Sequence, residues 1–158
     1  MKCIYVLAIG LGAGASLLAQ TEHSTDEKLI VYQPNRDGVT AGCRLVLEGR
    51  AWLQAGEHVW ITAARKDFAD LGLVWLQGEA EVDPMTHEFS LPVTLGIATD
   101  IGYSFRVSAE IVDDATHNRM RAKLIDMMAT NRHLPLPFPA TVYAPKHRVV
   151  KKVSHDGC

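Results

Sequence analysis

The chain has 158 residues, of which 47% are hydrophobic and 22% charged, and its formal net charge is −2. This composition is ordinary for a soluble globular protein, and the length suits one domain with a sizeable core. Proteins that bind nucleic acids usually carry a strongly basic face, so the charge predicts no nucleic-acid partner.

The first 19 residues differ from the rest of the chain. Lys2 is followed by an apolar run rich in small residues, which ends at Ala19 before polar sequence begins. This pattern is typical of a secretory signal peptide, cleaved after Ala19 or, as a second choice, after Ala15. The alternative is an uncleaved membrane anchor, for which the run is short and interrupted by glycines. We therefore expect an exported protein, periplasmic or extracellular, that meets the membrane only through residues 1–19.

Residues 20–28 are polar and predict a flexible lead-in, and we expect residues 29–158 to form a single domain. Apolar and polar residues alternate with period two in several stretches, as in half-buried β-strands. The predicted strands cover residues 29–32, 43–50, 58–64, 71–76, 88–95 and 103–112, and residues 66–70 are predicted as a loop. Pro92 cannot donate a hydrogen bond to a neighbouring strand, so we expect its strand either to lie at a sheet edge or to face solvent on that N–H side.

The hydrophobic period changes to that of a helix after residue 113. Apolar residues recur there at i, i+4, i+7 and i+8, on one helical face. They are Met120, Leu124, Met127 and Met128. We predict a helix over about residues 114–130, capped at its start by Asp113 or Asp114.

The rest of the chain is predicted to return to extended structure. Alternate prolines exclude a helix from residues 134–139, and residues 140–143 and 148–153 are predicted to close the chain as strands. Strands at intervals of about 10–15 residues, with no predicted helix before residue 113, favour an antiparallel β-sandwich over a parallel sheet. The late helix is expected to pack on that sandwich.

The strand at residues 58–64 leaves one informative alternative open. Val59 and Ile61 face one way and Trp60 faces the other. Either both faces of the strand are buried, or Trp60 is exposed and functional. Tryptophan on a central strand more often packs in a core. If Trp52, Trp60 and Trp75 are exposed together instead, they offer a platform for sugar rings or another small ligand.

No local motif for catalysis or metal binding is present. The chain has seven histidines, but no G-x-S-x-G, H-E-x-x-H or C-x-x-C pattern. Asp113, Asp114 and His117 could offer metal ligands, yet a solvent-facing helix cap is the preferred interpretation. We therefore expect no catalytic residues, no metal, no cofactor and no enzymatic activity. A hydrolase with a dispersed site is a weaker alternative, because catalytic triads are recognised by geometry and not by spacing.

Two features of the sequence bear on surface contacts and covalent links. The C-terminal segment is basic, and either contacts an anionic partner or surface, or protects an edge strand from pairing. Its basic residues are Lys146, Arg148, Lys151 and Lys152. Without residues 1–19 the cysteines are Cys43 and Cys158, which in an exported protein form one disulfide or stay as two free thiols.

Four phrases, LVLEGRAW, GEHVWITAARKD, VWLQGEAEVDPMTHEFSLPVTLG and DIGYSFRVSAEIVDD, resemble the strands of bacterial immunoglobulin-like domains of envelope and secreted proteins. The resemblance covers about residues 40–115. It implies an antiparallel immunoglobulin-like sandwich and brings no catalytic residues with it. The chain departs from antibody-type domains because Cys43 has no partner cysteine on the strand at residues 103–112.

The sequence therefore predicts an exported, non-enzymatic β-sandwich that acts by contact with another envelope or extracellular protein. The alternative is a module that binds carbohydrate or a small ligand through exposed tryptophans. Such folds host many functions, so the resemblance does not choose between the two.

Overall fold

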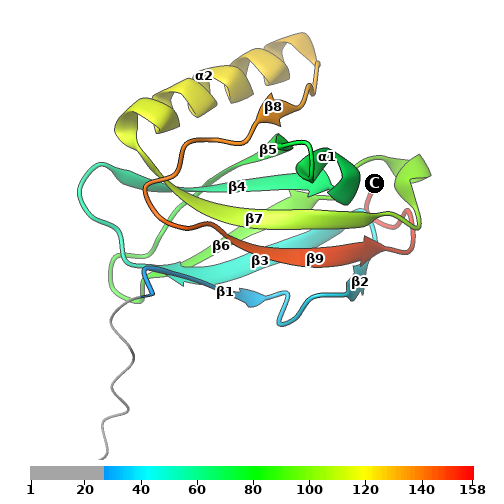
Figure 1. Cartoon of the computed structure of the whole chain (residues 1–158), viewed down its shortest axis with the longest axis horizontal. Coiled ribbons are helices and arrows are strands. Elements are labelled where there is room, and N and C mark those ends of the chain that lie inside the picture. The colour runs from blue at the N-terminus through cyan, green and yellow to red at the C-terminus, as the bar shows by residue number, and fades with distance from the viewer. Residues whose placement is uncertain (1–26) are drawn as a thin grey trace, which may run out of the picture.

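In the computed structural model, which describes residues 27–158, two β-sheets pack face to face and one long helix lies across the larger sheet (Figure 1). The predicted signal peptide and most of the predicted lead-in lie outside the described residues. The chain is mainly β, as predicted. Within residues 27–158, no helix has both the length and the hydrophobicity needed to cross a membrane.

The smaller sheet is antiparallel and has the strand order β1–β3–β6. Its strands are β1 (Leu29–Gln33), β3 (Arg44–Ala51) and β6 (Glu88–Thr94). β6 pairs with β3 on one side and lies at the edge of this sheet. The edge position, one of the two expected from Pro92, is therefore confirmed.

The larger sheet has the order β2–β9–β7–β4–β5–β8. Its strands are β2 (Val39–Ala41), β4 (Glu57–Arg65), β5 (Leu73–Ala80), β7 (Ser104–Asp113), β8 (Leu136–Pro137) and β9 (Lys146–Lys152). β2 runs parallel to β9, so this sheet is mixed, whereas a purely antiparallel arrangement was expected. The three-residue β2 is too short for a period-two pattern to reveal it.

The long helix α2 (Asp114–Thr130) has the bounds that the sequence predicted. The Asp113 side chain caps it by accepting a hydrogen bond from the Thr116 amide at 2.7 Å. Asn131, with a left-handed φ of 51°, ends it.

Two local predictions are wrong. Residues 66–70, predicted as a loop, contain the short helix α1 (Lys66–Ala69). Residues 140–143, predicted as a strand, form a loop that crosses the larger sheet, where the Val142 amide donates to the Ile111 carbonyl at 2.9 Å.

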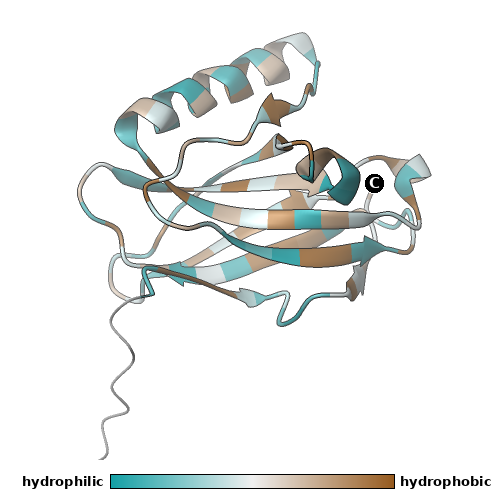
Figure 2. Cartoon of the chain, viewed as in Figure 1, coloured by the Kyte–Doolittle hydropathy of each residue, from teal (hydrophilic) through white to brown (hydrophobic). Residues whose placement is uncertain are grey.

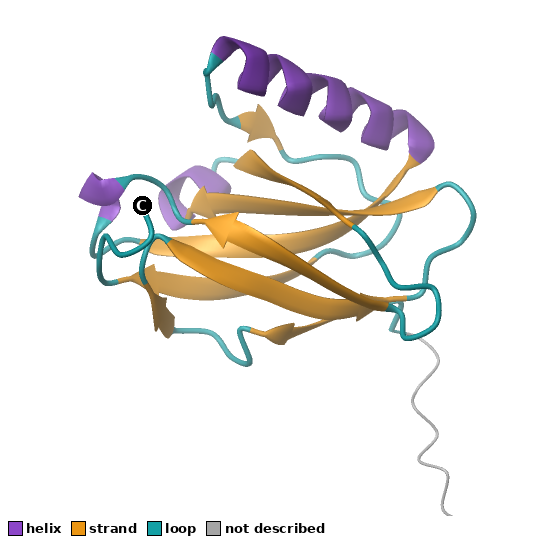
Figure 3. Ribbon diagram, turned by 180° about the vertical axis from the view of Figure 1, so that it is seen from behind, coloured by secondary structure: helices purple, strands orange, loops and turns teal. Residues whose placement is uncertain are grey.

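The main core lies between the two sheets, where alternate residues of facing strands meet (Figure 2). It includes Leu29, Leu47, Ile61, Phe89, Val93, Phe105, Val107 and Ile111. A second, smaller core lies between the larger sheet and α2, on the side away from the smaller sheet (Figure 3). It consists of Trp60, Leu76, Val112 and Met120. Strands β4 and β7 are consequently buried on both faces.

The predicted apolar face of α2 is correct except at its end. Met120 and Met127 are buried and Leu124 is partly buried, but Met128 is 71% exposed. Met128 follows Met127 directly and therefore projects about 100° further around the helix, away from the sheet.

Candidate functional site: a polar cluster beneath the long helix

Polar side chains from two strands and α2 meet on the outer face of the larger sheet. The period-two geometry of β4 puts His58 and Trp60 on this face, and Glu79 of β5 pairs in register with Trp60. Asp114 and His117 reach the same place from the first turns of α2. We call His58, Glu79, Asp114 and His117 the histidine cluster.

His58 is held at both ring nitrogens by carboxylates. Its Nδ1 lies 2.8 Å from Oε1 of Glu79, and its Nε2 lies 2.9 Å from Oδ1 of Asp114. Burial lowers the pKa of His58, but hydrogen bonds and charge attraction from Asp114 and Glu79 outweigh it and leave the pKa above its ordinary value. The ring is therefore fixed in orientation by one strand residue and one helix residue.

His117 links this exposed ion-pair arrangement to the buried Trp60. Its ring stacks on that of His58, with centroids 3.8 Å apart and planes inclined by 15°. The indole N–H of Trp60 donates to Nδ1 of His117 at 3.2 Å, and Oε1 of Glu79 lies 3.5 Å from the same nitrogen. Because Nδ1 accepts a hydrogen bond, we assign the proton of neutral His117 to Nε2.

The donor atoms of three of these residues are close enough together to share one ion. One ligand atom from each of His58, Glu79 and His117 lies within 4.8 Å of the other two. The Glu79 side chain is 40% exposed, so the cluster opens to solvent on this side. Two imidazole nitrogens and one carboxylate oxygen are a ligand set that borderline divalent metals use.

A buried carboxyl group lies on the same sheet face. Glu110 of β7 pairs in register with Trp60, and its Oε1 accepts a hydrogen bond from the Thr62 hydroxyl at 2.7 Å. Its Oε2 has no hydrogen-bond partner among the described residues. Burial raises the pKa of Glu110 to about 8, so the group is mostly protonated at pH 7. The period-two alternation of its strand turns Glu110 away from the main core, yet the residue is fully buried.

The three tryptophans lie in different environments and do not form one platform. Trp60 is 1% exposed beneath α2, which settles the alternative posed by its strand: both faces are buried. Trp75 packs edge-on against Phe68, with ring centroids 5.2 Å apart. Trp52 lies beside His87, with centroids 5.6 Å apart, and is the most accessible of the three. The preferred core position of Trp60 is therefore confirmed, and the alternative of a shared exposed platform is wrong for this residue.

The four basic residues predicted as a surface contact also have separate roles. Lys151 is exposed, and Lys146 pairs with Glu27. Arg148 donates to the carbonyl oxygens of Val31, at 2.6 Å, and Pro34, at 3.1 Å, and so joins β9 to the β1 end of the smaller sheet.

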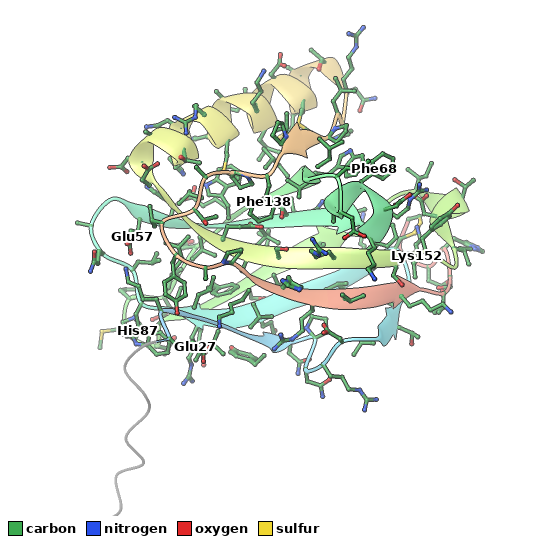
Figure 4. All side chains as sticks on the ribbon, viewed as in Figure 1. Glu27, Glu57, Phe68, His87, Phe138 and Lys152 are labelled. Atoms are coloured by element: carbon green, nitrogen blue, oxygen red, sulfur yellow. A yellow bond between two sulfur atoms is a disulfide. The ribbon has the colours of Figure 1, made fainter. Side chains whose placement is uncertain are left out.

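Lys152 is fully buried, and predicting it as a surface residue was wrong. Its Nζ donates to the carbonyl oxygens of Leu95, at 2.8 Å, and Ile97. Figure 4 shows this side chain at the end of β9. β2 pairs with β9 over Val150–Lys152, so Lys151 and Lys152 do not guard a sheet edge.

The two candidate disulfide residues are joined in the structure. Cys43 and Cys158, 115 residues apart in sequence, form a disulfide with a Cα–Cα distance of 4.9 Å. The Cys43 amide also donates to the Asp156 carbonyl at 2.7 Å. The C-terminal residue is thus tied to the start of β3.

No element within residues 27–158 covers the outer face of the smaller sheet, and an acidic hollow of about 620 Å³ lies there. It is lined by Tyr32, Glu48, Glu81, Asp83, Pro84, Glu88, Phe89 and Ser90. The Asp83 carboxylate accepts hydrogen bonds from the amides of Met85 and Thr86, which lower its pKa. Asp83 therefore carries a negative charge that also holds the turn before β6.

Local spacing did not reveal the histidine cluster because its members are far apart in the chain. In the sequence, His117 was grouped with Asp113 and Asp114 as possible metal ligands, but in the structure Asp113 caps the helix. Its ring partner, His58, comes from a strand 59 residues earlier, and Glu79 comes from the next strand. The period-two alternation of β4 was the one sequence signal for this cluster, because it places His58 and Trp60 on the same face of the strand.

Comparison of the chain with protein-family models finds no match, and comparison with curated proteins finds none either.

Proposed function

We propose that this protein is an exported, non-enzymatic module with an immunoglobulin-like fold, which binds a positively charged segment of another envelope or extracellular protein through the outer face of its smaller sheet. The observation that carries the proposal is the contrast between the two outer faces. α2 covers the larger sheet over β4, β5 and β7, whereas the smaller sheet presents Tyr32 and Val46 to solvent beside the acidic hollow.

The strand order supports the immunoglobulin-like fold. Strands β1–β3–β6 correspond to strands A, B and E of such domains, and β9–β7–β4–β5 correspond to G, F, C and C′ of the second sheet. α2 then occupies the connection between F and G. Two departures from antibody domains are clear: Cys43 bonds to the C-terminal residue, and Trp60 packs under α2 and not between the sheets.

Charge complementarity supports a basic partner. The hollow is lined by the carboxylates of Glu48, Glu81, Asp83 and Glu88. The Arg50 side chain pairs with Glu88 at 2.7 Å and neutralises one of them. A lysine or arginine side chain that enters the hollow can pair with the others, and the exposed Tyr32 ring offers aromatic contact.

Export is supported by the disulfide and by the signal-like N-terminal sequence. Disulfides persist in oxidising compartments and are rare in the cytosol of mesophiles. The absence of a local catalytic motif from the sequence supports the non-enzymatic part of the proposal. The scattered tryptophans give no specific support to a carbohydrate-binding alternative.

The test is a pull-down from the envelope fraction of the source cells, with captured proteins and glycans both identified. Glu48→Gln/Glu81→Gln should lose a specific protein partner that the wild type recovers. Asp126→Gln, which removes an exposed carboxylate on α2, is the matched control and should keep that partner. Equal recovery by the wild type and Glu48→Gln/Glu81→Gln, or recovery of polysaccharide alone, would overturn the proposal.

A further inference from the structure

We propose that His58, Glu79 and His117 form a binding site for a borderline divalent transition-metal ion such as Zn²⁺, with Asp114 orienting His58. This inference concerns the helix-covered side of the molecule and is independent of the proposed partner surface. It assigns to the histidine cluster a ligand that joins α2 to strands β4 and β5.

The distances between donor atoms suit such an ion. Nδ1 of His58 lies 2.8 Å and Nδ1 of His117 lies 3.5 Å from Oε1 of Glu79. Bond lengths of about 2.0–2.2 Å from Zn²⁺ to nitrogen and oxygen place tetrahedral ligand atoms roughly 3.4 Å apart. The two observed distances lie on either side of that value, so each nitrogen is at about the separation from the carboxylate oxygen that coordination of one ion needs.

Asp114 occupies the place of an outer-shell carboxylate. Metal-binding histidines usually donate their second ring N–H to a carboxylate or carbonyl, which fixes the tautomer. The Asp114 carboxylate lies 2.9 Å from Nε2 of His58 and directs Nδ1 toward Glu79. A metal ion on Nδ1 needs that nitrogen without a proton, so the proton of metal-bound His58 lies on Nε2, where Asp114 accepts it.

Ion binding requires a specific rearrangement of the rings. The His58 and His117 planes are stacked and nearly parallel, so an ion in the plane of one ring lies outside the plane of the other. His58, with 25% of its side chain exposed, is the ring with room to turn. An ion on Nδ1 of His117 also displaces the indole N–H of Trp60, so binding should change the fluorescence of this buried tryptophan.

Three protein ligands leave the fourth tetrahedral position to water. Glu79 lies at the solvent side, so an ion can enter without unfolding of the helix. Because the ligands come from β4, β5 and α2, the ion should bind the folded chain more tightly than the unfolded chain and so raise its thermal stability.

The experiment is titration of the metal-free protein, prepared without a polyhistidine tag, with ZnCl₂ at pH 7.5. Isothermal calorimetry should show one Zn²⁺ per chain, and tryptophan emission and the melting temperature should change with the same saturation curve. Glu79→Gln and His58→Gln should each weaken binding at least tenfold. Asp114→Asn should weaken it about 10–100-fold, as removal of an outer-shell partner does.

His147→Gln is the matched control, because it removes an exposed histidine on β9. This variant should bind Zn²⁺ as the wild type does. Absence of stoichiometric binding in the wild type would overturn the proposal, and so would unchanged affinity in Glu79→Gln and His58→Gln. Both variants alter partly exposed side chains, so the test does not depend on replacing the buried His117.

Discussion

Glu110 is the residue whose burial conflicts most with its chemistry. One oxygen accepts a hydrogen bond from Thr62, and within residues 27–158 the other oxygen has no hydrogen-bond partner and no cationic side chain forms an ion pair with the group. Loss of hydration on burial therefore favours the protonated form and raises its pKa to about 8, against an ordinary value of 4.5.

This raised pKa predicts a stability that falls as pH rises. Between pH 4.5 and 8 the unfolded chain loses the Glu110 proton while the folded chain keeps it, so the folded state binds more protons. The Glu110→Gln side chain does not titrate, so this variant lacks the contribution of Glu110 to the pH dependence of stability. The free energy of unfolding of Glu110→Gln minus that of the wild type should rise from pH 5 to pH 8 by on the order of 3 kcal/mol, at about 1.4 kcal/mol per pH unit. Urea unfolding at several pH values measures the difference, and parallel pH curves for the two proteins would contradict it.

A buried lysine gives a second prediction at the residue scale. Lys152 donates from Nζ to the Leu95 and Ile97 carbonyls, whereas its neighbour Lys151 is exposed. Lys152→Met leaves these carbonyls without their donor and should lower the free energy of unfolding by about 2 kcal/mol. Lys151→Met is the control and should change it by less than about 0.5 kcal/mol. Chemical denaturation of both variants decides, and equal effects would show that Lys152 has no special structural role.

At the scale of elements, α2 is attached to the sheet by few side chains. Met120 contributes to the small core with Trp60, Leu76 and Val112, while Met128 points to solvent. Met120→Ala should lower the free energy of unfolding by about 2–4 kcal/mol, because it leaves a cavity between helix and sheet. Met128→Ala should have almost no effect. Circular dichroism during urea unfolding measures both, and similar costs for the two would mean that α2 docks by another face.

The strength of the local signal decides which elements could be predicted. The helix bounds 114–130 were predictable because Asp113 caps the start and the apolar period is that of a helix. The strands of the main core were predictable from period-two alternation. Helix α1 and strand β2 are four and three residues long, and so short an element carries no readable period.

The histidine cluster could not be predicted, because it depends on where α2 lies. The β4 pattern placed His58 and Trp60 on one face but did not say what covers that face. Docking of α2 brings Asp114 and His117 to this face, on which Glu110 is also buried. Tertiary packing, and not local spacing, creates this site.

At the scale of the whole molecule, the Cys43–Cys158 disulfide closes nearly the full described length of the chain. The bridged residues are 115 positions apart, and the last strand β9 already holds the C-terminal segment beside β2 and β7. A cross-link over so long a loop removes much conformational freedom from the unfolded chain. The expected contribution to the free energy of unfolding is about 2–4 kcal/mol.

This contribution predicts a redox-dependent stability. In a chain beginning at residue 20, dithiothreitol should lower the urea midpoint of the wild type to that of Cys43→Ser/Cys158→Ser and leave the variant unchanged. The reduced protein should still fold, because the core between the sheets and the hydrogen bond from the Cys43 amide to the Asp156 carbonyl need no disulfide. A reductant-insensitive midpoint in the oxidised wild type would mean that the C-terminal segment is held by β9 alone, and would remove the disulfide as an argument for an oxidising compartment.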